Sequence, residues 1–188
     1  WGDRYLYKPH LHWIVDQSID FLETRDPTRP FCLYTSFSKP HPPFDPCPEF
    51  WHLYDRIEMD DPISSDWDSD VHPAWMHSTW TLSGGDRLAS ELVRQIRRAY
   101  YALITHVDYT LGLLIARLRE LKLLENTLIV FTSDHGEMLG DPGMWAKASP
   151  FEGSMHVPMI VRPHRSDPLD ALRGTKCDAI ARDRKSVV

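Results

Sequence analysis

Two stretches of the chain repeat apolar residues at helical spacing. Residues 12–22 do so ahead of two prolines, which predicts a short amphipathic helix. A longer helix is predicted from Glu91, where the mean step between apolar residues is about 3.6. Because Arg94, Arg97 and Arg98 lie largely elsewhere on the helical wheel, we expect the apolar face to pack on a sheet. That face consists of Leu92, Ile96, Tyr100, Leu103, Val107, Leu111, Leu114, Leu118 and Leu121.

Three compact apolar runs are typical of buried strands. They cover residues 31–37, 127–132 and 157–161, and Cys32 in the first run is expected to be a small core residue. The long helix separates the first two runs. This strand, helix, strand order predicts an α/β fold with a mainly parallel sheet flanked by helices. Residues 55–85 lack a steady period, and we expect a packed lid or a substrate-lining insertion there.

Polar side chains of distinctive chemistry follow these runs. Lys39 and His41 lie on a proline-rich loop after the first run, Asp134 and His135 follow the second, and Lys147 precedes the third. In α/β proteins, ligands bind where strands end. A carboxylate and a neutral imidazole can bind a divalent cation, lysine can bind a tetrahedral oxyanion, and histidine can protonate a leaving oxygen. Together these groups suit hydrolysis of a sulfate or phosphate ester.

Each of these clusters also has an ordinary structural interpretation. Taken alone, Lys39 and His41 are compatible with incidental charges on an exposed loop. Taken alone, Asp134 and His135 are compatible with an Asx turn that starts a helix, because Asp is a common helix cap. The functional interpretation therefore depends on both clusters occurring at strand ends.

Composition narrows the class of partner. The 188 residues suffice for one domain, and a formal net charge of −6 gives no electrostatic footprint for nucleic acid or for an anionic membrane surface. No apolar run approaches the roughly 20 residues of a membrane span. Three scattered cysteines argue against a disulfide framework. The chain begins without Met, so its first residues predict no compartment, and its oligomeric state is equally open.

Several motifs of the chain occur in a distinctive combination. They are Lys39-Pro40-His41-Pro42-Pro43-Phe44, Tyr101 to Asp108 with Gly112, Ser133 to Asp141, Trp145-Ala146-Lys147, and Glu152-Gly153-Ser154 with Val157-Pro158. In combination these motifs resemble the sulfatase family of the alkaline-phosphatase superfold. The resemblance implies that Asp134 and His135 bind a calcium ion, or another divalent cation, that holds the sulfate. It also implies that Lys147 contacts sulfate oxygens, that His41 protonates the departing alcohol or phenol, and that Lys39 lies near the substrate.

The chain also departs from the family pattern. Sulfatases carry near their N-terminus a Cys-x-Pro-Ser-Arg or Cys-x-Ala-x-Arg signature whose cysteine becomes formylglycine, the nucleophile. Cys47 lacks the neighbours of that signature, and Pro142 stands where many relatives have the histidine of Gly-Asp-His-Gly. The last six residues are those that a common sequencing adapter encodes when translated. We therefore expect residues 1–182 to be a truncated catalytic domain, without its nucleophile segment and C-terminal subdomain, and residues 183–188 to be an artefact tail.

The expected activity of the full-length parent is metal-dependent hydrolysis of a small sulfate ester or sulfated sugar, by the formylglycine mechanism. The isolated chain is expected to be inactive, because it lacks the nucleophile. Two alternatives remain open. One is a phosphonate monoester or phosphodiester hydrolase of the same superfold, and the other is a non-catalytic module that binds anions.

Overall fold

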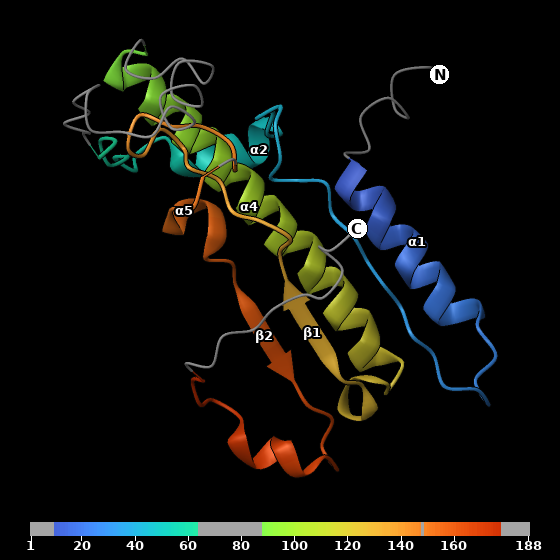
Figure 1. Ribbon diagram of the computed structural model, residues 1–188. Coiled ribbons are helices and arrows are strands. Elements are labelled where there is room, and N and C mark those ends of the chain that lie inside the picture. The colour runs from blue at the N-terminus through green and yellow to red at the C-terminus, as the bar shows by residue number, and fades with distance from the viewer. Residues whose placement is uncertain (1–9, 64–87, 148, 178–188) are drawn as a thin grey trace, which may run out of the picture.

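A computed structural model describes residues 10–63, 88–147 and 149–177. Both predicted helices are confirmed: α1 spans His10–Thr24 and α4 spans Ser90–Glu120, and they pack side by side (Figure 1). In these ranges, no helix combines the length and apolarity needed to cross a membrane. The shorter elements are α2 (Pro48–Trp51), η1 (His52–Tyr54), η3 (Leu124–Asn126), β1 (Ile129–Thr132), α5 (Glu152–Met155), β2 (Met159–Arg162) and η4 (Pro168–Leu172).

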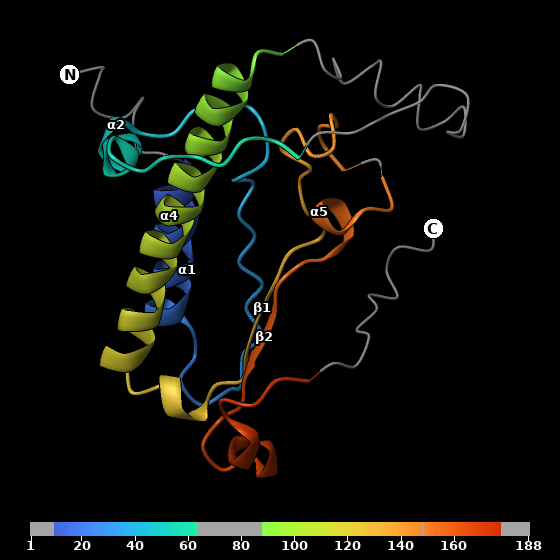
Figure 2. The ribbon, with the colours of Figure 1, turned by 90° about the vertical axis from the view of Figure 1, so that its left-hand side faces the viewer.

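The main core lies between the two long helices and one face of the sheet (Figure 2). Burying each of its aliphatic side chains contributes roughly 1.5–3 kcal/mol. The buried Ser18 of α1 donates to the carbonyl of Ile14, and its hydroxyl lies 3.1 Å from that of Thr35. This contact ties residues 31–37 to the helix. The core consists of Val15, Leu22, Leu114, Leu118 and Leu124, with Ile19, Phe31, Leu33, Phe37 and Ile129 packed against it.

The prediction of a mainly parallel sheet is wrong for the sheet that the described residues form. Strands β1 and β2 are antiparallel, with Thr132 opposite Met159 and Ile129 opposite Arg162. The reason is the path of the connection. The chain leaves β1, passes through α5 and returns to the end of β1 that it has just left, whereas a parallel partner would need a crossover to the other end.

Residues 31–37 are extended and run in the same direction as β1 (Figure 1), but no strand of the described residues pairs with them. Their side chains alternate between half-buried and exposed, as in a strand with one face on a core. Cys32 falls on the exposed side, so its prediction as a core residue was wrong. Residues 64–85 of the predicted lid and the predicted tail at 183–188 lie outside the described residues.

A buried histidine joins three of the helices. His106 of α4 is 1% exposed, and the Phe50 ring of α2 stacks on it with centroids 4.1 Å apart. The ring of His12 of α1 lies 5.1 Å away. Burial, reinforced by the neighbouring His12, lowers the pKa of His106 to about 4. The imidazole is therefore neutral near pH 7 and acts as a packing side chain.

Candidate active site

The predicted site residues lie on loops where β1 ends, next to α5 (Figure 2). One buried residue of α5, Ser154, fixes two of these loops. The carbonyl of Ser154 accepts from the backbone N–H of Gly136 at 2.7 Å, and its hydroxyl donates to the carbonyl of Lys147 at 2.5 Å. Ser154 therefore sets the spacing between the segment of His135 and the segment of Lys147. Its part in holding these loops was not predicted from the sequence.

The backbone approach at Gly136 is too close for any other residue. A Cβ atom there would lie 2.1 Å from the carbonyl oxygen of Gly153. That oxygen belongs to α5, so it cannot move without shifting Ser154 and its two hydrogen bonds. The glycine after Asp134-His135 is thus a steric requirement of the site.

Three of the predicted side chains contact one another. The Nζ atom of Lys147 lies 2.6 Å from Nε2 of His135, and the rings of His41 and His135 meet edge to face with centroids 5.9 Å apart. The Oδ2 atom of Asp134 lies 3.7 Å from Nε2 of His135. The structure therefore brings together residues from the loop after residues 31–37, the loop after β1 and the loop before α5. This convergence favours a site over the two separate structural interpretations.

The tautomer of His135 follows from its hydrogen bonds. Its Nδ1 atom lies 2.7 Å from the carbonyl oxygen of Gly136, which can only accept, so Nδ1 carries the proton. The lone pair is then on Nε2, where Lys147 donates. Asp134 is 87% exposed at its side chain, and no helix begins there, so the helix-cap alternative is wrong. Among the described residues, its Oδ1 atom accepts only from the adjacent N–H of His135, at 3.1 Å.

Lys39 has a different environment from the other predicted residues. Its ammonium donates to the carbonyl of Pro43 at 2.6 Å and forms an ion pair with Asp45, and its side chain is 18% exposed. These bonds close the proline-rich loop on itself, with cis peptide bonds before Pro40 and Pro43. In this structure Lys39 supports the loop that carries His41 and does not contact His135.

Glu137 and the backbone before Lys147 hold the lysine loop in place. The Oε1 atom of Glu137 accepts from the N–H of Ala146 at 2.5 Å, and the N–H of Met138 donates to the carbonyl of Ala146. Ala146 has a φ of +64°, which is strained for a residue with a Cβ atom. A strained residue immediately before Lys147 indicates that this turn is fixed by its surroundings.

Arg97 of α4 anchors the loop that follows these residues. Its side chain is 8% exposed, pairs with Asp141 at 2.5 Å and donates to the carbonyl of Leu139 at 3.1 Å. It also donates to the carbonyls of Asp60 and Asp61. The helix, the segment at residues 60–61 and the loop after Met138 thus meet at one guanidinium. The sequence analysis placed Arg97 off the packing face, because arginine counts as polar in a periodicity pattern.

Cys47 is the cysteine nearest to these loops in sequence. Burial raises the pKa of its thiol, and the carboxylates of Glu49 and Asp45 raise it further. A nucleophilic cysteine needs the opposite shift, since the thiolate is the reactive form. Cys32 and Cys177 are exposed and free. The thiol of Cys47 therefore lacks the lowered pKa that a thiolate nucleophile needs.

The described residues supply a partial donor set for a metal ion. The exposed carboxylate of Asp134 and the Nε2 lone pair of His135 fit a divalent cation, and the bond from Nδ1 to a backbone carbonyl is the usual support for a metal-ligating histidine. No group of three or more His, Cys, Asp or Glu side chains that could hold a metal occurs in the described ranges. Calcium takes six to eight oxygen ligands. Asp134 and His135 therefore fit as two members of a larger ligand set.

Comparison with known proteins decides the family. The family model described as Sulfatase matches residues 7–168. The chain belongs to the sulfatase family. Its resemblance in sequence motifs is thus confirmed.

Individual relatives match this sulfatase chain over a part of their own length. It is 35% identical to an arylsulfatase of Clostridium perfringens over 179 residues, which cover 94% of this chain and 35% of the relative. It is 40% identical to a choline-sulfatase of Rhizobium meliloti over 137 residues, which cover 71% of this chain and 26% of the relative. The chain therefore spans about a quarter to a third of the length of these curated relatives.

Solved structures share the fold. A phosphonate monoester hydrolase of Agrobacterium radiobacter superposes with a TM-score of 0.73 at 28% identity, over 82% of this chain and 33% of that one. A sulfatase from Bacteroides fragilis, described as putative, superposes with a TM-score of 0.62 at 25% identity, over 81% of this chain and 30% of that one. The sulfatase and alkaline-phosphatase-like fold class is thereby confirmed.

Proposed function

We propose that this chain is part of a sulfuric ester hydrolase of the formylglycine type, and that the loops after β1 bind the sulfate group of a small sulfate ester or sulfated sugar. The observation that carries this proposal is the contact of His41, His135 and Lys147 at one end of β1. The names of the relatives support the substrate class, since both the arylsulfatase and the choline-sulfatase are named for sulfate esters.

Lys147 and His41 have separate roles in the proposed reaction. The ammonium of Lys147 is exposed and adjacent to His135, so it can bind the sulfate oxygens and stabilise negative charge in the transition state. His41 is exposed beside the same imidazole and can donate a proton to the bridging oxygen as the ester bond breaks. Lys39 acts by holding the loop of His41.

Asp134 and His135 would hold the divalent cation, which we propose to be calcium. When bound, the cation would neutralise charge on the transferring sulfate group. Lys147 now donates to the same Nε2 atom that would bind the cation. Binding therefore requires the ammonium to turn away from His135, toward the anion that the cation holds.

We also propose that the formylglycine nucleophile belongs to a segment outside these 188 residues, together with a C-terminal subdomain, and that residues 1–182 alone are inactive. The absence of the cysteine signature supports this proposal. The last six residues remain a proposed artefact tail.

A phosphonate monoester or phosphodiester hydrolase is the second candidate, favoured by the structural similarity to the Agrobacterium enzyme. A comparison of kcat/KM for p-nitrophenyl sulfate and for a p-nitrophenyl phosphonate monoester distinguishes the two, using a full-length protein that contains this chain. We expect the sulfate ester to be the better substrate, because the arylsulfatase and the choline-sulfatase that resemble this chain are both named for sulfate esters. Preference for the phosphonate would select the second candidate, and no turnover of either ester would select the non-catalytic module.

A further inference from the structure

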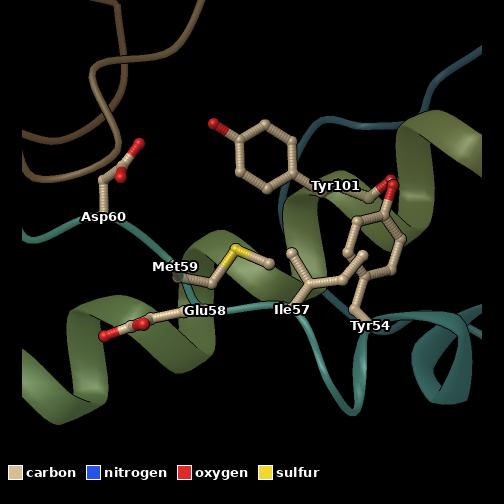
Figure 3. A pocket seen from close by; sticks show the side chains of 6 residues that line it. All are labelled: Tyr54, Ile57, Glu58, Met59, Asp60 and Tyr101. Carbon is tan, nitrogen blue, oxygen red and sulfur yellow. The ribbon is translucent and has the colours of Figure 1, made fainter.

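A second candidate binding site lies on the opposite side of α4 from the core, in an open hollow that contains none of the proposed catalytic residues. Figure 3 shows this hollow between α4, η1 and the segment that follows η1. Its volume is about 320 Å³, which suits a small ligand. The lining residues are Tyr54, Ile57, Glu58, Met59, Asp60 and Tyr101.

Two tyrosine rings form a fixed wall of the hollow. The rings of Tyr54 and Tyr101 are stacked, with centroids 6.3 Å apart and planes inclined by 19°. The hydroxyl of Tyr54 lies 2.6 Å from that of Thr105 and donates to the backbone carbonyl of Tyr101 at 3.2 Å. Because Tyr54 is held at its hydroxyl end, little conformational entropy is lost when a ligand contacts its ring. Met59, 8% exposed, contributes a buried apolar side chain.

Two carboxylates line the hollow, and the arginines of the first turns of α4 do not pair with them. Glu58 and Asp60 are exposed, and in the described part of the chain neither carboxylate forms an ion pair. Each arginine of the first turns of α4 is committed elsewhere. The pairs are Arg94 with Asp61 and Glu91, Arg97 with Asp141, and Arg98 with Asp55.

We propose that this hollow binds a small organic cation of the quaternary ammonium class. The faces of the tyrosine rings attract such a cation, and the carboxylates of Glu58 and Asp60 complement its charge. An anionic ligand is disfavoured by the same carboxylates. A calcium ion is disfavoured because two carboxylates fall short of the six to eight oxygen ligands that it takes, and the hydroxyl of Tyr54 is already hydrogen-bonded. Figure 3 shows the Asp60 carboxylate on the same side of the opening as the Tyr101 ring, whereas the Glu58 side chain extends away from both rings, so Asp60 is the main carboxylate of the proposed site.

NMR titration of the full 188-residue chain with choline tests the proposal. The neutral isostere 3,3-dimethylbutan-1-ol has the same shape without the charge, and it is the matched control ligand. We expect choline to shift the resonances of Tyr54, Met59 and Tyr101 saturably, and to bind about fivefold more tightly than the neutral alcohol. Equal binding of the two probes, or no saturable shift of these resonances, would overturn the proposal.

Two variants test whether choline binds in this hollow. Asp60→Asn removes one charge from an exposed position and keeps the fold, so choline binding is expected to weaken about threefold with no change for the neutral alcohol. Tyr101→Leu is expected to weaken it about fivefold. Asp108→Asn and Tyr109→Leu change exposed residues of the same helix outside the hollow and serve as controls. Equal losses in the Asp60 and Asp108 variants would show a nonspecific charge effect and refute the site.

A third experiment asks whether the bound cation is part of the substrate or an independent ligand. In a full-length protein that turns over p-nitrophenyl sulfate, a cation that belongs to the substrate inhibits competitively, whereas an independent ligand leaves KM unchanged. Binding by the 188-residue chain does not depend on catalysis. The cation site can therefore be confirmed or refuted independently of the proposed sulfatase activity.

Discussion

Replacing Gly136 by alanine is expected to destabilise the chain by roughly 3 kcal/mol or more. The added Cβ atom would lie 2.1 Å from the carbonyl oxygen of Gly153, a backbone atom with no rotamer to relieve the clash. Moving Gly136 away from α5 also breaks the hydrogen bond from its N–H to the carbonyl of Ser154. The loop of His135 is then no longer tied, through Ser154, to the loop of Lys147. Urea unfolding, followed by circular dichroism, measures the change.

Two other glycines give matched controls for this substitution. Gly112 lies inside α4, and a Cβ atom there would meet nothing within 4 Å. Gly112→Ala is therefore expected to stabilise the chain by about 0.5–1 kcal/mol, because alanine is the better helix former. The stability of the Gly153→Ala variant should fall between those of the Gly136 and Gly112 variants. A Cβ atom at Gly153 would lie nearest to the flexible Met138 side chain, at 3.2 Å. Equal stability of the Gly136 and Gly112 variants would refute the close approach.

Replacing Arg97 by leucine is expected to destabilise the chain by about 3–5 kcal/mol. The substitution leaves the Asp141 carboxylate without its buried partner and removes donors from the carbonyls of Leu139, Asp60 and Asp61. The cost of an unpaired carboxylate exceeds the gain from a better apolar side chain at this position. Urea unfolding again measures the loss.

Arg94→Leu is the matched control on the same helix, one turn earlier. Arg94 also forms two ion pairs, with Asp61 and Glu91, but both of its carboxylate partners are well exposed, at 68% and 65% of their side chains. Exposed pairs contribute about 0–1 kcal/mol, so this variant should unfold close to the parent. If the two variants proved equally stable, Arg97 would not be the anchor of the loop.

The sequence predicted the helices well because their signal is local. Apolar residues at a step of about 3.6 specify a helix with little information from the rest of the chain. The prediction of which side of α4 is buried was less accurate. Leu92 is 47% exposed, whereas Arg97 and His106 are buried. Periodicity cannot identify a polar side chain that is buried because it has a distant partner.

The sheet and the site depended on contacts between distant residues. The direction of β2 is set by the path of the chain through α5, which no local pattern encodes. The convergence of His41, His135 and Lys147 was predicted because all three follow or precede predicted strands. Ser154 and Glu137 act through backbone hydrogen bonds to the loops, and such bonds leave no compositional signal.

The central claim is that Lys147, beside His135 and His41, binds the sulfate group of the substrate. The direct test is kcat/KM for p-nitrophenyl sulfate in a full-length protein that contains this chain, with Lys147→Ala compared with Lys176→Ala, an exposed lysine of the same chain. Removal of one charged donor to a developing oxyanion costs about 100-fold to 1,000-fold. We predict that loss for Lys147→Ala and an unchanged value for Lys176→Ala. An unchanged kcat/KM in the Lys147 variant would contradict the claim.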